Sequence, residues 1–368
     1  MKLVVDENIP GADELFTQFG AVVRLPGRAI SAAVVRDADI LIVRSVTRVD
    51  EALLRGSRVR FVGSTTAGID HISLSDLDKL GIRFAHAPGS NADSVVDYVL
   101  GVLALRYPDA AAFGSRRIGI VGCGNVGGRL LRRLRALGIS CRVYDPLVEG
   151  IAESRGFDEV LGCDVLSLHV PLTSGGDFPT WHLLGATQLQ ALAPHALLIN
   201  TARGEVLDNA ALLALLRARE DLDAVLDVWE HEPQIDPALL ARTLIGTPHI
   251  AGYAVDGKLR GVAQVYAALC DFLQVGAPLE SFTALQLPSA GVIAPQASNW
   301  QQAVLGCYDP RADDARLRAL AVAAPAEFAA GFDRLRRDYL PRRELSAWRI
   351  DPGRGSERAS LVAAGLSA

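Results

Sequence analysis

Short apolar runs separated by amphipathic stretches are the main pattern in the first ninety or so residues. Leu3–Val5, Ile40–Val43 and Arg60–Gly63 are such runs, and residues 13–16 and 75–80 have the spacing of helices. Strands of a parallel sheet are covered by helices on both faces, so they have this nearly continuous apolar character. The pattern therefore predicts a parallel α/β sheet.

A second α/β series begins near Asp93. Its predicted helices are 94–105, 128–137 and 210–219, and its predicted strands are 117–121, 141–145, 165–168, 196–200 and 224–227. Strands and helices that alternate in this way are typical of a doubly wound nucleotide-binding domain. After Gly252 the pattern becomes helical over 256–273, a stretch that can lead the chain back to the first domain.

The chain is therefore predicted to have three domains and an α/β fold. We expect two doubly wound parallel-sheet (Rossmann-like) domains, one discontinuous over 1–92 and 256–284 and one over 93–255. Residues 285–368 are rich in Ala and Arg and indicate a small C-terminal α+β domain. Residues 353–368 contain Gly and Ser and few apolar anchors, so we expect them to be loosely ordered.

Composition narrows the classes of function. Among 368 residues half are hydrophobic and the formal net charge is −5, so nothing indicates a nucleic-acid partner. No apolar run reaches the ~18 residues of a membrane span. The five cysteines form no CxxC pair and the histidines no HExxH pattern, so no metal site is expected. We expect reduced thiols, a cytoplasmic protein and a small-molecule partner.

A glycine-rich loop follows the predicted strand 117–121 and precedes a helix. It reads Gly122-Cys123-Gly124-Asn125-Val126-Gly127, the GxGxxG spacing of dinucleotide sites. In that interpretation Gly122 permits the tight turn, Gly124 lets the backbone approach a pyrophosphate, and Gly127 lets helix and strand pack closely. The helix N-terminus offers N–H groups to the phosphates. The alternative is a glycine turn that serves only packing.

Asp145 ends the next predicted strand, eighteen residues after Gly127. A carboxylate there can accept hydrogen bonds from ribose hydroxyls and repels a 2′-phosphate, which favours NAD over NADP as the cofactor. Arg142, three residues earlier, weakens this preference. The alternative role for Asp145 is a cap before Pro146.

Three charged or titratable residues supply the expected chemistry. Arg203 follows a strand end, and its guanidinium suits a planar carboxylate. His249 can exchange a proton near neutral pH. Glu232, seventeen residues earlier, can hydrogen-bond the other ring nitrogen of His249. His231 adjoins Glu232 and is the rival histidine, although its position points it elsewhere. These groups suit hydride transfer between a nucleotide and a 2-hydroxy acid.

The sequence resembles the D-isomer-specific 2-hydroxyacid dehydrogenases over about residues 35–275. The likeness rests on the glycine loop and on three later segments, Asn200–Gly204, Asp227–Pro233 and Thr247–Gly252. The resemblance implies a substrate-binding domain split by an inserted NAD-binding domain. It also implies catalysis by an Arg–Glu–His set, onto which Arg203, Glu232 and His249 fall, and a nicotinamide contact from Asp227.

Further segments are similar to one branch of this family, which oxidises 4-phospho-D-erythronate in vitamin B6 biosynthesis. They are Val5–Pro10, Val43–Thr47, Gly63–His71, Thr180–Leu183 and His249–Tyr253. This likeness implies that residues 285–368 form a dimerisation domain and that the protein is a homodimer. It places Ser45, Thr66 and Tyr253 on the substrate, and Asp145, Thr173, Thr201, Ala202, Asp227 and Gly252 on NAD.

Charge alone suggests partners for the substrate phosphate. Arg44 is the first candidate, and Arg342 and Arg343 are further ones that could reach the site across a dimer. Two other functions stay open. One is a different D-2-hydroxyacid dehydrogenase, acting on 3-phosphoglycerate or glycerate, and the other is a non-enzymatic NAD sensor of the corepressor type.

Overall fold

The chain forms two compact units. The computed structural model describes residues 1–276, 287, 289–292, 297–352, 355 and 357–368. One unit comprises Met1–Asn91 and Ala254–Pro288, and the other comprises Ala92–Tyr253 and Ser289–Ala368. The predicted boundary between residues 284 and 285 lies outside the described residues.

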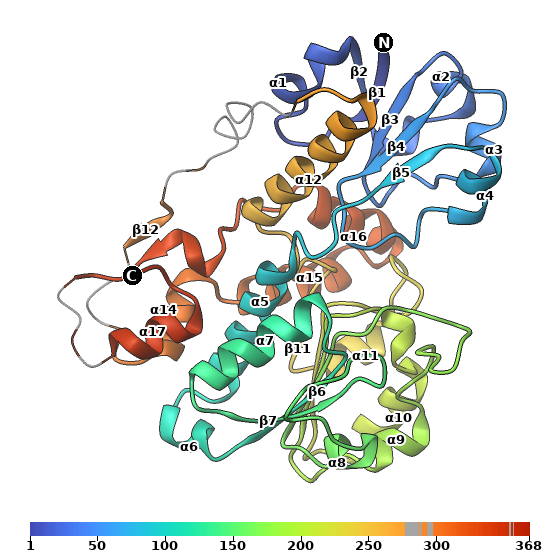
Figure 1. The fold of residues 1–368 in the computed structure, drawn as a ribbon. Coiled ribbons are helices and arrows are strands. Elements are labelled where there is room, and N and C mark those ends of the chain that lie inside the picture. Colours follow the sequence, from blue (N-terminus) through green and yellow to red (C-terminus); the bar gives the residue numbers. More distant parts are fainter. Residues whose placement is uncertain (277–286, 288, 293–296, 353–354, 356) are drawn as a thin grey trace. The chain divides into compact units, whose positions relative to one another are not determined.

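The first unit is built on a five-stranded parallel sheet with the order β2-β1-β3-β4-β5 (Figure 1). The strands are β1 (Lys2–Asp6), β2 (Ala21–Leu25), β3 (Ile40–Val43), β4 (Phe61–Ser64) and β5 (Arg83–Ala85). Its helices are α1 (Ala12–Phe16), α2 (Ala32–Val35), α3 (Glu51–Leu54), α4 (Leu74–Lys79) and α12 (Val255–Leu273).

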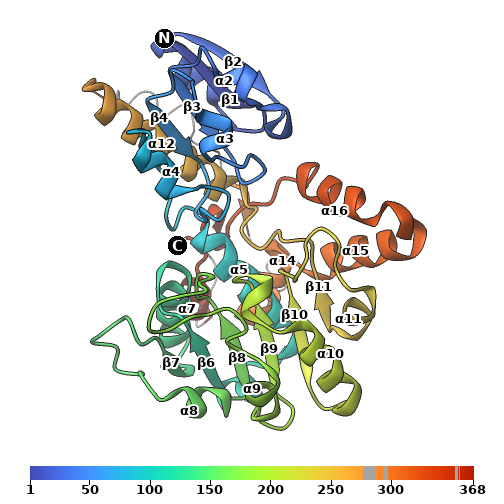
Figure 2. The same cartoon turned by 90° about the vertical axis from the view of Figure 1, so that its right-hand side faces the viewer.

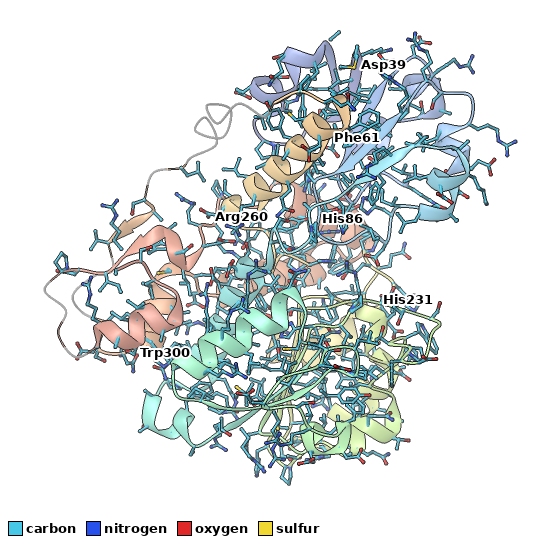
Figure 3. All side chains as sticks on the ribbon, in the orientation of Figure 1. Asp39, Phe61, His86, His231, Arg260 and Trp300 are labelled. Atoms are coloured by element: carbon cyan, nitrogen blue, oxygen red, sulfur yellow. The ribbon has the colours of Figure 1, made fainter. Side chains whose placement is uncertain are left out.

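Successive residues of these strands enter two cores, one on each face of the sheet. Leu3 and Ile42 pack with residues of α1 and α12, whereas Val4 and Leu41 pack with residues of α2, α3 and α4. Figure 3 labels Phe61, whose ring centroid lies 5.4 Å from that of Phe272 on α12. Helix α12 thus packs on the sheet of the first unit.

The second unit contains a six-stranded sheet with the order β11-β10-β9-β8-β6-β7. Its strands are β6 (Arg117–Val121), β7 (Ser140–Tyr144), β8 (Val165–Leu168), β9 (Leu197–Asn200), β10 (Asp223–Leu226) and β11 (Ile245–Gly246). Its helices before residue 254 are α5 (Ala92–Arg106), α6 (Ala110–Gly114), α7 (Asn125–Ala136), α8 (Phe157–Leu161), α9 (Ala186–Gln190), α10 (Asn209–Ala218) and α11 (Pro237–Arg242). The strand order reverses between β6 and β8, and ligands of doubly wound sheets bind at such a point, beyond the carboxyl ends of the strands. The predicted fold of two parallel α/β sheets is confirmed.

The C-terminal region packs on both faces of the second unit. It contains α14 (Trp300–Cys307), α15 (Arg311–Ala323), α16 (Phe328–Arg337) and α17 (Arg358–Ala364), and β12 (Gly291–Val292) pairs with β13 (Trp348–Arg349). Trp300 joins the core formed with α5 and α7, whereas Leu317 and Phe332 join the core on the opposite face. Figure 2 shows α15 beside α16.

The expectation that residues 353–368 are loosely ordered is wrong for α17. Leu361 of this helix is fully buried in the core with α5 and α7. In the part of the chain that the structure describes, every helix is too short or too polar to cross a lipid bilayer.

Candidate active site

The glycine loop joins β6 to α7 and has the geometry that a dinucleotide requires. Gly122 has a φ of +88°, which an L side chain rarely adopts. A Cβ on Gly127 would lie 1.9 Å from the carbonyl oxygen of Gly122, so only glycine lets the helix pack here. A Cβ on Gly124 would meet nothing within 4 Å. The backbone at Gly124 is therefore open to a ligand.

Helix α7 begins at Asn125, directly after this open glycine. Its first N–H groups and the positive end of its dipole face the direction from which a phosphate would approach. The carboxylate of Asp145 accepts hydrogen bonds from the N–H groups of Cys123 (2.7 Å) and Leu147 (3.0 Å). Asp145 therefore fixes the loop at the end of β7, and the loop residues fit a bound NAD.

His249 and Glu232 form the charged centre of the site. The carboxylate oxygen Oε2 of Glu232 lies 2.8 Å from Nδ1 of His249, and Oε1 accepts the N–H of Trp229 at 2.9 Å. Nε2 is thus the ring nitrogen of His249 that is left to exchange a proton. His231, labelled in Figure 3, is exposed in the loop after β10, and Glu232 turns to His249 instead.

The electrostatics of Glu232 favour its ionised form. Burial by itself raises the pKa of this carboxyl, but the charge and hydrogen bond of His249 outweigh burial and hold the pKa below its ordinary value. Arg336 contributes in the same direction. An ionised Glu232 can orient the His249 ring and stabilise the imidazolium that forms when Nε2 takes a proton.

The loop that carries His249 is anchored by the buried carboxylate of Asp227, at the end of β10. One oxygen accepts the hydroxyl of Thr247 and the N–H of Ile250, both at 2.7 Å, and the other accepts the N–H of Ala251 at 2.9 Å. The N–H of His249 donates to the carbonyl of Asp227 at 2.7 Å. The structure therefore gives Asp227 a loop-building role, beside the nicotinamide contact that the resemblance implies.

The sequence interpretation assigned no role of their own to two residues of this network. The hydroxyls of Tyr98 and Thr247 lie 2.8 Å apart, and both residues are buried. Tyr98 lies on α5, so the network links that helix to the His249 loop. Thr247 directly precedes Pro248 and His249, and that adjacency was the only available signal.

Arg203 lies in a tight loop after β9 that the side chain of Asn200 shapes. Asn200 donates to the carbonyl of Arg203 (2.9 Å) and accepts the N–H of Ala202 (3.0 Å). The guanidinium of Arg203 donates to the carbonyl of Ala202 at 2.6 Å. Asn200 is fully buried, and sequence reasoning did not single it out.

Two other predicted cofactor residues lie in loops at the carboxyl ends of β8 and β9. The hydroxyl of Thr201 is 3.4 Å from Nδ1 of His169, whose Nε2 bonds Ser167. Burial lowers the pKa of His169 to about 3, so this ring is neutral at pH 7. The N–H of Thr173 donates to the hydroxyl of Thr180 at 2.8 Å.

Relatives of known name match nearly the whole sequence. An erythronate-4-phosphate dehydrogenase of Pseudomonas putida is 49% identical over 99% of this chain and 98% of its own length. One of Cellvibrio japonicus is 48% identical over 95% of this chain and 94% of its own. The chain belongs to the erythronate-4-phosphate dehydrogenases. Residues 107–251 match the NAD-binding domain of the D-isomer-specific 2-hydroxyacid dehydrogenases, so the chain is an NAD-dependent oxidoreductase.

Solved structures of the wider family resemble only part of the chain. A 3-phosphoglycerate dehydrogenase of Entamoeba histolytica with bound NAD⁺ is 26% identical with a TM-score of 0.65, over 75% of this chain and 96% of its own. A D-lactate dehydrogenase of Aquifex aeolicus is 23% identical with a TM-score of 0.63, and it shares the fold over 77% of this chain and 98% of its own. The C-terminal residues 283–365 match a domain of unknown function.

The residues that the resemblance places on the substrate are divided between the two units. In the first unit Arg44 and Ser45 follow β3, and Ser45 is exposed. The hydroxyl of Thr66, just after β4, donates to the carbonyl of Gly68 at 2.9 Å. Tyr253 belongs to the second unit, where it follows Gly252 at the end of the His249 loop.

Arg342 has a structural role that the sequence did not indicate. Its buried guanidinium donates to the carbonyl groups of Ser94 and Ala251 in its own chain and lies 4.3 Å from the ring centroid of Tyr308. The hypothesis that Arg342 binds phosphate across a dimer stays a prediction, and these contacts give Arg342 a role within its own unit as well. Arg342 ties the His249 loop to α5.

Proposed function

We propose that this protein oxidises 4-phospho-D-erythronate at C2, giving 2-oxo-3-hydroxy-4-phosphobutanoate, in the biosynthesis of pyridoxal 5′-phosphate. The observation that carries the proposal is the identity of 45 to 50% to erythronate-4-phosphate dehydrogenases, which for the Pseudomonas putida relative extends over 99% of the chain. That likeness includes the C-terminal quarter, whereas these solved structures of the wider family match only 75 to 77% of the chain.

The side chains divide the chemistry among them. Arg203 holds the C1 carboxylate and polarises the carbonyl that forms at C2. His249 takes the proton of the C2 hydroxyl through Nε2, while Glu232, 2.8 Å from Nδ1, stabilises the charged ring. NAD, when bound, accepts the C2 hydride. In the reverse direction the imidazolium of His249 returns the proton.

The remaining contacts follow from the family resemblance. Gly122, Gly124, Asn125, Val126 and Gly127 hold the pyrophosphate of NAD on the N-terminus of α7. The other cofactor contacts are Asp145, Thr173, Thr201, Ala202, Asp227 and Gly252. Ser45, Thr66 and Tyr253 contact the substrate, and Arg44 is a partner for its phosphate. The protein acts as a cytoplasmic homodimer that forms through residues 285–368.

A substrate panel tests the proposal. Purified protein with NAD is given 4-phospho-D-erythronate, 3-phosphoglycerate or D-glycerate, with a 2-oxo acid as hydride acceptor and His249→Ala as control. We expect selective turnover of the phosphoerythronate and at least a roughly 100-fold loss of kcat in the variant. Preference for 3-phosphoglycerate or glycerate would mean that the protein is a D-2-hydroxyacid dehydrogenase of different substrate specificity. Binding of NAD without turnover of any acid would favour a sensing role.

A further inference from the structure

The C-terminal region contacts both sides of the His249 loop within the second unit. Before the loop, the carboxylate of Asp314 on α15 accepts the N–H of Gly246 at 2.7 Å. After it, Arg342 donates to the carbonyl of Ala251. The ring of Tyr339 meets that of Tyr253 edge-on, with centroids 5.9 Å apart. Residues beyond 288 thus build part of the catalytic surroundings in the same chain.

Arg336, near the end of α16, is a cation of this region that lies beside Tyr253 and Glu232. Its guanidinium carbon is 5.7 Å from the ring centroid of Tyr253, a residue proposed to contact substrate. Burial alone lowers the pKa of Arg336, but Tyr253 and the carboxylate of Glu232 outweigh it and keep the guanidinium charged. Arg336 therefore lies near both Tyr253 and Glu232, the carboxylate that bonds His249.

Arg336, like Arg342 at Nη1, has a buried guanidinium nitrogen without a partner, whereas two neighbouring arginines are paired with carboxylates. Arg318 pairs with Asp314 on α15 at 2.8 Å, and the exposed Arg337 pairs with Asp338 at 2.9 Å. The guanidinium of Arg336 hydrogen-bonds the side chain of Tyr253, but its Nε is buried and has no hydrogen-bond partner in the structure. Glu232 and Asp333 supply negative charge nearby, yet both oxygens of Glu232 already bond His249 and Trp229. A buried N–H without a partner is costly, which favours an anionic ligand.

We propose that Arg336 is a substrate-binding residue that takes the phosphate group of the hydroxy acid beside Tyr253. The inference rests on the proposed function, because Arg203 is there assigned to the other anionic group, the C1 carboxylate. A planar guanidinium can offer two parallel N–H donors to phosphate oxygens, and stacking on an aromatic ring fixes its plane. Arg336 lies within residues 283–365, which match a domain separate from the NAD-binding domain of the wider family.

The test compares each variant on a phosphorylated and an unphosphorylated substrate. Arg336→Ala should lower kcat/KM for 4-phospho-D-erythronate roughly 10- to 100-fold, the usual range for a lost charge-assisted hydrogen bond, and change that for D-erythronate less than about threefold. Arg336→Lys keeps the positive charge but lacks the two parallel N–H donors of the guanidinium. Its kcat/KM for 4-phospho-D-erythronate should therefore lie between that of Arg336→Ala and that of the wild type. Inorganic phosphate should compete with the substrate less well in Arg336→Ala than in the wild type.

Arg337→Ala is the matched control, because it removes an exposed arginine from the next position of α16. NAD binding and the thermal midpoint should be unchanged in all variants, and Arg336→Gln replaces Arg336→Ala if the latter does not fold. Equal losses on both substrates would overturn the proposal and make Arg336 a positioning residue for Glu232. Unchanged kinetics would overturn it outright.

The proposed function can fail separately. If the wild type prefers another phosphorylated acid, the same ratio is measured with that acid and its dephosphorylated form, and the phosphate role of Arg336 stands or falls on that ratio. If the wild type turns over only unphosphorylated acids, both proposals fail.

Discussion

At the scale of single residues, His249 is fixed by both its backbone and its side chain. Its φ of +55° is uncommon for a residue with a Cβ, and the bond from its N–H to the carbonyl of Asp227 holds that conformation. Its ring is held by Glu232. The backbone conformation therefore fixes the position of the His249 side chain, and the carboxylate of Glu232 fixes the orientation of its ring.

Replacing Glu232 with glutamine should slow the chemistry without weakening the cofactor site. Glu232→Gln keeps the size of the side chain but removes the negative charge that favours the imidazolium, so kcat should fall roughly 10- to 1000-fold. Pre-steady-state kinetics and NAD titration measure the two effects. Glu230→Gln is the control, because Glu230 bonds His182 instead. Equal losses in both variants would contradict this role of Glu232.

Sequence reasoning reached some of these residues and missed others for a physical reason. His249 and Glu232 are polar residues of functional type, so they stand out in a pattern. Asn200, Thr247 and Tyr98 act by hydrogen bonds whose partners are distant in sequence or belong to the backbone. Those bonds exist only after β9, β10 and α5 have come together, and no local pattern reveals them.

At the scale of elements, apolar runs predicted the central strands and the edge strand β7 but missed three other edge strands. Strands β1, β3 and β4 are almost entirely buried, and each was predicted within a residue of its bounds. Strands β2 and β5 lie at the edges of their sheet and are partly exposed, and β11 has two residues. An edge strand needs fewer apolar residues, so its signal is weak.

The glycine loop offers a matched pair of substitutions. Gly127→Ala places a Cβ 1.9 Å from a backbone oxygen, so β6 and α7 must separate and the protein should lose about 2 kcal/mol or more of stability. Gly124→Ala meets only open space and should leave the unfolding midpoint unchanged while weakening NAD binding about tenfold or more. Denaturant melts and NAD titration separate the two. A stable Gly127→Ala protein would refute this packing.

The contact of α5 with α7 and the C-terminal region should make stability depend on pH. Burial raises the pKa of Asp97 to about 6, although Arg133 and the N–H of Leu345 oppose the rise. The folded state then binds more protons than the unfolded state between about pH 4 and 6. This contribution to stability is present below pH 4 and lost as pH rises through 6, by about 3 kcal/mol at most.

Melting of the wild type and Asp97→Asn at pH 4, 5, 6 and 7 checks that sign. Relative to the variant, the wild type should become less stable between pH 4 and 6 and change little above that range. A relative gain in stability over the same interval would mean that Asp97 is ionised throughout.

At the scale of the molecule, the C-terminal region is part of the second unit, because its side chains complete both cores of the six-stranded sheet. Composition predicted a separate small domain here and could not show this integration, because it does not say which core the apolar residues of the region join. Trp300 and Phe332 are nevertheless buried against elements that precede residue 254.

Removing a C-terminal core side chain should therefore destabilise the NAD-binding sheet. Phe332→Ala should lower the free energy of unfolding by about 3–5 kcal/mol. Bound NAD raises the melting temperature of the NAD-binding domain, and the variant should lower that same melting temperature. Val322→Ala, at a position 84% exposed on α15, should shift that melting temperature very little. Thermal melts with and without NAD provide the measurement. A separate early transition that leaves the NAD-sensitive one in place would show an autonomous domain instead.

The buried hydrogen bond between Ser94 and Glu344 couples a residue of α5 to one of the C-terminal region. The hydroxyl of Ser94 on α5 donates to the carboxylate of Glu344 at 2.6 Å, and both side chains are shut away from water. A lineage that lost the C-terminal region would leave Ser94 facing solvent, and one that gained it would need a partner for Glu344. The two positions should consequently change together across relatives, so that relatives without a hydroxyl at position 94 also lack the acidic residue at position 344.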